Sequence, residues 1–130
     1  MLDASALLAY LRAEPGADAV EDLLTGDESC MAHAISLCEV YYKLQKYEAE
    51  SEVRLAMQEF KHVGLAVRTD LDEPFWLKVG GYKAAMRSVP LADCFVVALA
   101  NRTNSPAVTA DRPDFELVGK QGLCQVRFIR

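Results

Sequence analysis

The chain has 130 residues, of which 52% are hydrophobic and 25% are charged, and its formal net charge is −5 at pH 7. These values are typical of one globular domain with a substantial hydrophobic core, so we expect residues 1–130 to form a single domain. The acidic balance excludes a strongly basic coat for nucleic acid. It does not exclude a nucleic-acid enzyme whose acids hold a metal ion, because the ion reverses the local charge.

No apolar run approaches the roughly 20 residues of a membrane span, and no basic segment precedes the first apolar residues. We therefore expect no membrane anchor and no signal peptide, and a cytoplasmic protein. The cysteines are widely spaced and include no C-x-x-C pair, which argues against a zinc site. We expect them to be reduced residues of the core. They are Cys30, Cys38, Cys94 and Cys124.

Apolar periodicity and helix breakers divide the chain into alternating helices and short strands. Helices are predicted over residues 6–11, 17–24, 34–47, 48–63, 72–86 and 91–100. Strands are predicted over residues 28–33, 65–67, 107–109 and 124–129, of which residues 65–67 form a buried strand. Turns are predicted over residues 110–115 and 119–122. This alternation favours an α/β fold with a mainly parallel sheet, whose ligands bind at the carboxyl ends of the strands.

The stretch from Leu91 to Ala100 is apolar all the way round except for Asp93. A helix that is apolar on every face belongs inside a domain. An unpaired carboxylate buried there would cost several kcal/mol, so the helix dipole, hydrogen bonds or a cation must offset that cost. Two interpretations remain open for Asp93: a residue of the N-cap or first turn, or a carboxylate at the mouth of a site.

Four carboxylates lie beside apolar sequence or just past a predicted strand: Asp3, Glu39, Asp93 and Asp111. None has an obvious basic partner three or four residues away on the buried face. Singly, each also has a plain structural explanation, such as a helix cap for Asp3, a solvated helix position for Glu39 or a turn for Asp111. Jointly, a shared metal ion is the economical explanation, because several carboxylates do not stay ionised together without a cation. Ligand sets made only of oxygen favour Mg²⁺ or Mn²⁺.

Four segments, in order along the chain, resemble the PIN-domain nucleases, and most closely the small VapC-type toxins of bacterial toxin–antitoxin pairs. They are LDASALL at residues 2–8, SLCEV at 36–40, LADCFVVA at 91–98 and TADRPDF at 109–115. One such segment alone would be weak evidence, because an aspartate followed by a helix is common. Four of them in order over nearly the whole chain make a specific signal.

The resemblance implies a three-layer α/β/α PIN-like fold with a mainly parallel sheet of four to five strands. It implies an endoribonuclease that hydrolyses RNA with Mg²⁺ or Mn²⁺, forms a homodimer and is silenced by a small antitoxin. The helix over residues 72–86 could supply the dimer interface. Carried over to this sequence, the resemblance assigns catalytic and metal-binding roles to Asp3, Glu39, Asp93 and Asp111, an accessory ligand role to Asp114 and a supporting role to Ser5.

Two features depart from the family pattern. Only Met1 and Leu2 precede Asp3, which is about 7 Å of extended chain, whereas a mean strand has roughly 5–6 residues. The central strand is therefore stunted, or the true start of the protein lies upstream. In addition, two aspartates compete for the role of the fourth ligand, Asp111 and Asp114.

Alternative interpretations remain for the cations and for the function. Arg102 and Arg112 lie near the two C-terminal acidic segments, either as RNA-backbone ligands or as ordinary solvated arginines. His33 and His62 are isolated, and acids suffice for metal-based hydrolysis. A receiver domain or a haloacid-dehalogenase-type phosphatase is disfavoured, because the chain lacks their early pairs of acids. The main alternative function is a non-catalytic PIN-like module that binds RNA or protein.

Overall fold

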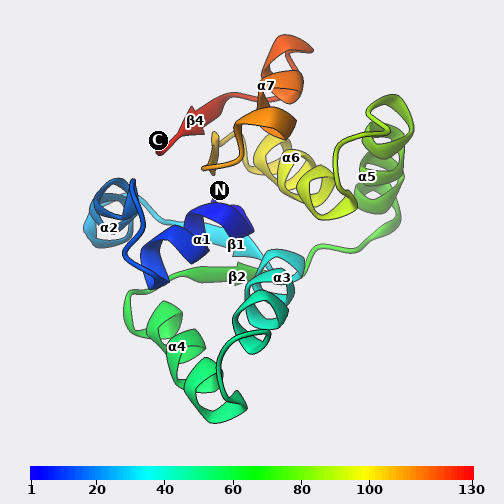
Figure 1. Ribbon diagram of the computed structural model, residues 1–130. Coiled ribbons are helices and arrows are strands. Elements are labelled where there is room, and N and C mark those ends of the chain that lie inside the picture. The colour runs from blue at the N-terminus through cyan, green and yellow to red at the C-terminus, as the bar shows by residue number, and fades with distance from the viewer.

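A computed structural model describes the whole chain, Met1–Arg130 (Figure 1). It contains seven helices: α1 (Ala4–Leu11), α2 (Ala17–Thr25), α3 (Ala34–Gln45), α4 (Glu50–His62), α5 (Glu73–Ala85), α6 (Leu91–Thr103) and α7 (Arg112–Lys120). It contains four strands: β1 (Met31–His33), β2 (Ala66–Arg68), β3 (Ala107–Thr109) and β4 (Val126–Phe128). None of the helices combines the length and the apolar character that a membrane crossing requires.

The second residue of the chain joins two pairs of parallel strands into one continuous sheet. Strand β1 pairs with β2, and β3 pairs with β4. Between these pairs, Leu2 forms a parallel bridge with Val108 and its N–H donates to the Met31 carbonyl at 2.9 Å. The Val108 N–H donates to the Met1 carbonyl at 2.7 Å. The order across the sheet is therefore β2, β1, Leu2, β3, β4, with the N-terminal segment at the centre.

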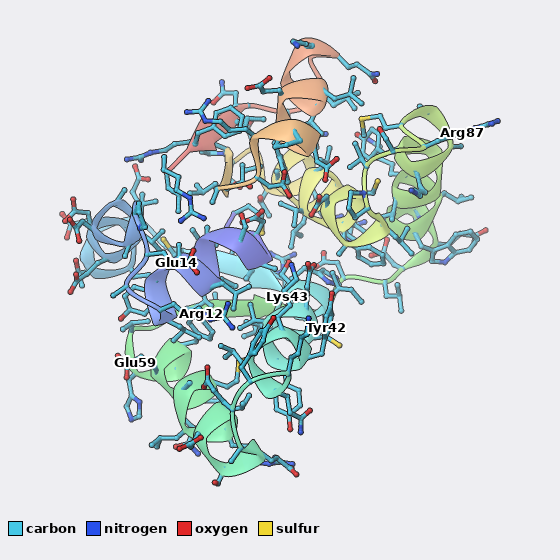
Figure 2. All side chains as sticks on the ribbon, viewed as in Figure 1. Arg12, Glu14, Tyr42, Lys43, Glu59 and Arg87 are labelled. Carbon is cyan, nitrogen blue, oxygen red and sulfur yellow. The ribbon has the colours of Figure 1, made fainter.

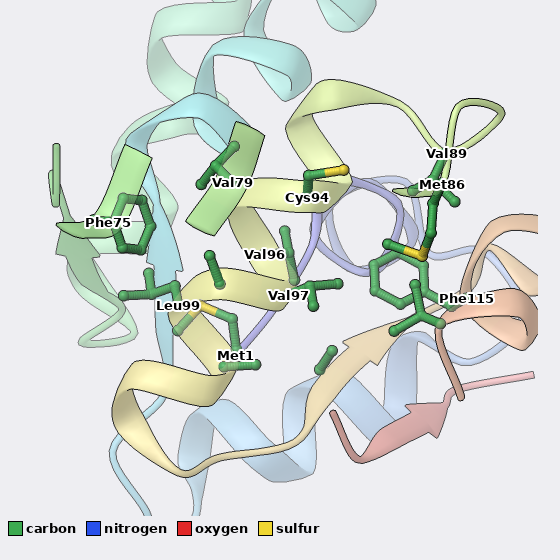
Figure 3. Close-up of a cluster of buried hydrophobic side chains, with 14 residues drawn as sticks. Met1, Phe75, Val79, Met86, Val89, Cys94, Val96, Val97, Leu99 and Phe115 are labelled. Atoms are coloured by element: carbon green, nitrogen blue, oxygen red, sulfur yellow. The ribbon is translucent and has the colours of Figure 1, made fainter. Parts of the chain in front are cut away.

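Successive residues of the central segments point to opposite faces of the sheet, and each face is covered by its own core. Met1 and Ala107 belong to the core that lies against α5, α6 and α7, which Figure 3 shows in close-up. Their neighbours Leu2 and Val108 belong to the core that lies against α1, α2, α3 and α4. The predicted three-layer α/β/α architecture is therefore confirmed.

Each predicted helix and strand is present, but helix α7 was missed. We predicted turns over residues 110–115 and 119–122, whereas Arg112–Lys120 is helical. Asp111 is the N-cap of this helix and accepts the Asp114 N–H at 3.3 Å, and Pro113 lies in its first turn. Both are signals of a helix start as well as of a turn. Burial of Phe115 one turn into the helix shows which interpretation is right.

Two expectations about burial were also wrong. Strand β2 is exposed over Ala66 and Val67, because it lies at the edge of the sheet with one neighbouring strand. The cysteines are free, as expected, but Cys38 is exposed on the surface of α3. The buried helix is confirmed, since α6 buries nearly every residue between Asp93 and Ala100.

Candidate active site

Three of the predicted acids converge at the carboxyl end of β3, beside the N-termini of α6 and α7. Asp93, Asp111 and Asp114 each offer one carboxylate oxygen, and these oxygens all lie within 4.8 Å of one another. Asp93 lies in the first turn of α6, where Pro90 is the N-cap residue. Asp111 caps α7 directly after β3, and Asp114 lies in the first turn of α7. The positive ends of two helix dipoles therefore face the three acids, which we call the acidic cluster.

Asp3 lies behind the acidic cluster and caps α1. Its side chain is only 2% exposed. Its Oδ1 accepts the Ala6 N–H at 2.8 Å, and its Oδ2 accepts the Thr109 hydroxyl at 2.6 Å. Ser5 Oγ lies 2.9 Å from both carboxylate oxygens. The cap interpretation of Asp3 is thus correct, and the same carboxylate is also tied to the end of β3.

Two hydroxyl groups connect Asp3 to the loop that carries Asp111. Ser5 Oγ accepts the Ala110 N–H at 2.8 Å, and Thr109 Oγ1 accepts the Asp111 N–H at 2.8 Å. Thr109 is fully buried, and its residue type alone does not mark it as a site residue. Its β-branched side chain indicates a strand residue equally well. One feature of the sequence could have identified Thr109 as a site residue. It lies at the carboxyl end of the predicted strand, two residues before Asp111.

Burial and crowding of negative charge disfavour ionisation in and around the acidic cluster. Burial raises the pKa of Asp3 to about 6, although the hydrogen bonds from Thr109, Ala6 and Ser5 oppose the rise. Burial and the charge of Asp111 raise the pKa of Asp114, although Lys83 opposes this. The pKa of Asp93 rises furthest, to about 8, because of burial and then the charges of Asp3, Glu39, Asp111 and Asp114. The cluster therefore favours either a bound proton or a cation.

Glu39 has a basic partner that the sequence analysis overlooked. Lys43 follows it by one helical turn on α3, and the two side chains form an ion pair. Our expectation that Glu39 lacks such a partner was therefore wrong. Its side chain is 19% exposed. Glu39 is not among the three convergent donors, but its charge contributes to the raised pKa of Asp93.

The structure does not bring Arg102 to the acidic cluster. It lies in the last turn of α6, about 13 Å from Asp93 along the helix axis at 1.5 Å per residue. Its guanidinium donates to Asp70 at 2.8 Å and to Asp72 at 2.6 and 2.8 Å. It also lies 4.8 Å from the centre of the Phe75 ring. These contacts hold the segment between β2 and α5 against α6.

Arg112 and His33 are also engaged within the protein. Arg112 begins α7, where its Nε donates to the Arg130 carbonyl at 3.0 Å and its guanidinium lies 4.6 Å from the Phe128 ring centre. His33 is the N-cap of α3, and its Nδ1 accepts the Ile35 N–H at 3.1 Å. The contact of Arg112 with RNA stays a prediction, since its side chain is still 55% exposed.

The fold and the site together define a three-layer α/β domain with an acidic cluster at the carboxyl ends of a parallel sheet. The model of the PIN domain matches residues 1–121, so the chain belongs to the PIN-domain family. The resemblance stated from the sequence is therefore confirmed. No curated protein sequence matches the chain significantly.

Three solved structures are similar over almost the whole chain. A chain of VapBC2 from Rickettsia felis, bound to a DNA fragment from their promoter, matches with a TM-score of 0.78 at 14% identity, over 98% of this chain and 96% of that one. VapBC-1 from nontypeable Haemophilus influenzae matches with a TM-score of 0.73 at 15% identity, over 99% and 96%. A toxin–antitoxin complex from Klebsiella pneumoniae matches with a TM-score of 0.71 at 17% identity, over 99% and 96%. At these identities the likeness shows a shared fold.

Proposed function

We propose that this chain is a metal-dependent endoribonuclease, the toxin component of a toxin–antitoxin pair. The observation that carries the proposal is the convergence of the Asp93, Asp111 and Asp114 carboxylates within 4.8 Å at the carboxyl ends of the sheet. Membership of the PIN-domain family and the shared fold with VapBC proteins support it.

The donor set suits a hard divalent cation. All three convergent donors are carboxylates, and Mg²⁺ and Mn²⁺ prefer oxygen ligands. The raised pKa of Asp93 reflects how much negative charge the site gathers, and a cation would relieve that crowding. Asp3 and Glu39 stay in the proposed ligand set because their charges reach Asp93.

The site residues have three proposed roles: metal binding, positioning of the loop that carries Asp111, and stabilisation of the ionised carboxylates. Asp93, Asp111 and Asp114 would hold the Mg²⁺ or Mn²⁺ ion, with Asp3 and Glu39 as further proposed ligands. The ion would supply Lewis-acid activation of the scissile phosphate and of the attacking water. Asp3, held by Thr109 and by the supporting residue Ser5, fixes the loop that carries Asp111. The dipoles of α6 and α7 favour the ionised carboxylates at their first turns.

The test is cleavage of panels of single-stranded and structured RNA by purified protein in Mg²⁺, Mn²⁺ or EDTA. The wild type is compared with Asp93→Asn and with Asp18→Asn, which makes the same change at an exposed acid in the first turn of α2. We expect metal-dependent cutting that only Asp93→Asn abolishes. No cutting, together with no metal binding by calorimetry, would favour the alternative, a non-catalytic PIN-like module that binds RNA or protein.

We also propose two protein partners, a small antitoxin and a second copy of the chain. The fold is shared with chains of VapBC and other toxin–antitoxin complexes. Large apolar side chains are exposed on α5 and beside it: Leu71 is 63% exposed, Trp76 47%, Leu77 55% and Leu91 52%. The exposure of Trp76, a large aromatic side chain, supports a partner that covers part of this region.

A further inference from the structure

Lys43 is the cation that adjoins the predicted acids on the face of α3. This helix packs on α1, which follows Asp3, and on α6, which carries Asp93. Arg12 and Lys43, both labelled in Figure 2, are in contact, since Arg12 Nη2 donates to the Lys43 carbonyl at 3.5 Å. The Lys43 side chain is 40% exposed, so its ammonium is accessible to a ligand in solution.

The ammonium of Lys43 stays charged at this position. Partial burial works against the charged form, but the hydrogen bond and charge of Glu39, followed by the charges of Tyr42 and then Asp3, raise the pKa of Lys43 above its ordinary value. Lys43 therefore carries a full positive charge within electrostatic reach of two proposed ligands. A phosphodiester that approaches the site would otherwise meet mainly carboxylates.

A second lysine near the site, Lys83, is engaged by the backbone. Lys83, whose charge reaches Asp114, donates to the carbonyls of Arg87 and Val89 at 2.7 Å each. These contacts close the loop between α5 and α6 and use two of the three ammonium donors. Lys43 is held at its ammonium by the Glu39 carboxylate. If Glu39 turns towards a divalent cation, the Lys43 ammonium needs a new anion.

We propose that Lys43 is a substrate-positioning residue, whose ammonium exchanges Glu39 for a non-bridging oxygen of an RNA phosphate at the edge of the acidic cluster. The inference rests on the proposed endoribonuclease function. A lysine suits this exchange because its ammonium is a compact charge on a flexible stem, which reaches either partner without a fixed geometry. Glu39 then has two successive roles, as the resting partner of Lys43 and as a ligand of the ion.

The experiment measures RNA binding as a function of salt. The probe is a short fluorescein-labelled single-stranded RNA with phosphorothioate linkages, in Mn²⁺, and the readout is fluorescence anisotropy at increasing KCl concentration. The variants are Lys43→Met, Lys43→Arg and the matched control Lys46→Met, which removes an exposed ammonium from the end of the same helix. We expect Lys43→Met to weaken binding and to make the slope of log K against log salt shallower by about 0.7, the value for one phosphate of a single strand.

The controls separate the role of Lys43 from folding and from metal binding. Lys43→Arg is expected to keep the wild-type slope, and Lys46→Met to match the wild type. A wild-type slope in Lys43→Met, together with tighter Mn²⁺ binding by calorimetry without RNA, overturns the proposal, because Lys43 would then only neutralise Glu39. If the wild-type protein binds this RNA but cuts no RNA, the proposed endoribonuclease function is wrong. The effect of the Lys43 substitutions on RNA binding can still be measured in that case. Wild-type protein that binds no RNA overturns both.

Discussion

Thr109 Oγ1 donates a hydrogen bond of 2.6 Å to Asp3 Oδ2, although 106 positions separate the two residues in the sequence. The bond joins the carboxyl ends of the two central segments of the sheet, and the same hydroxyl accepts the Asp111 N–H. One threonine therefore sets how Asp3 and Asp111 lie relative to each other.

Thr109→Val is expected to destabilise the protein and to weaken its binding of Mn²⁺. The substitution keeps the shape of the side chain but removes a hydrogen bond to a buried carboxylate, at a cost of about 1–3 kcal/mol. Urea denaturation measures the free energy of unfolding, and Mn²⁺ calorimetry measures the second effect. The control is Thr69→Val at an exposed threonine. Equal stability of the two variants would show that the bond to Asp3 contributes nothing.

Asp93 is expected to make the metal-free protein less stable as the pH rises. Its pKa is raised to about 8 in the folded chain, whereas an unperturbed aspartate has a pKa of about 3.9. The unfolded state therefore loses this proton first, and the free energy of unfolding falls between about pH 4 and pH 8. Asp93→Asn removes the part of this fall that Asp93 causes and leaves the smaller part that the raised pKa of Asp3 causes below about pH 6, so in EDTA at pH 8 it should be more stable than wild type. Asp18→Asn should keep the wild-type pH dependence, and an Asp93→Asn curve parallel to wild type would contradict the assignment.

Mn²⁺ is expected to stabilise the folded chain, and to do so more at pH 8 than at pH 6. Binding to Asp93 displaces a proton, so the affinity rises as that proton becomes easier to remove. At a free ion concentration of about 100 times Kd, the gain in unfolding free energy is about 2.7 kcal/mol. Thermal unfolding with and without Mn²⁺ measures it. Asp111→Asn and Asp114→Asn should each reduce the shift in Tm, and a shift that survives both would place the ion elsewhere.

Arg102→Ala is expected to reduce stability slightly, because the exposed guanidinium pairs with two carboxylates. Hydrogen bonds from Arg68 and from Arg102 hold the pKa of Asp70 at about 2, which shows how strongly this group is paired. Denaturation of Arg102→Ala beside Arg102→Lys measures the effect. The sequence-based expectation that Arg102 contacts RNA predicts a flatter salt dependence of RNA binding in the same variant. The structural role predicts an unchanged one.

Leu77→Glu is expected to convert a homodimer into a monomer. Leu77 is 55% exposed on α5, and a charge there would be buried at the proposed interface. Size-exclusion chromatography with light scattering measures the mass. The control is Leu55→Glu, at a leucine that is 70% exposed on α4. A wild-type protein that stays monomeric at high concentration would rule out the homodimer.

The elements that were predicted best are those whose sequence pattern has a single physical explanation. The stretch around α6 is apolar on every face, and only burial accounts for that, so both the helix and the unusual place of Asp93 followed from it. The alternation of short apolar runs with helices likewise predicted the parallel sheet.

The features that were missed depend on contacts between residues far apart in the sequence, or on residues that are equally common in two kinds of local structure. Asp111 and Pro113 begin turns as readily as helices, so α7 became evident only through its buried face. The role of Thr109 depends on a partner at the other end of the chain. Lys43 was missed for a different reason: it lies on the boundary of the buried face of α3, where a helical pattern does not distinguish a solvated lysine from a paired one.

The central place of Leu2 in the sheet has a consequence for the synthesis of the chain. Asp3 emerges from the ribosome 106 residues before its partner Thr109, and the acids of α7 emerge after Thr109. A growing chain therefore contains Asp3, Glu39 and Asp93 without the strand that organises them. The acidic cluster is completed only when β3 and α7 have left the exit tunnel, so its acids stay unorganised until most of the domain has been synthesised.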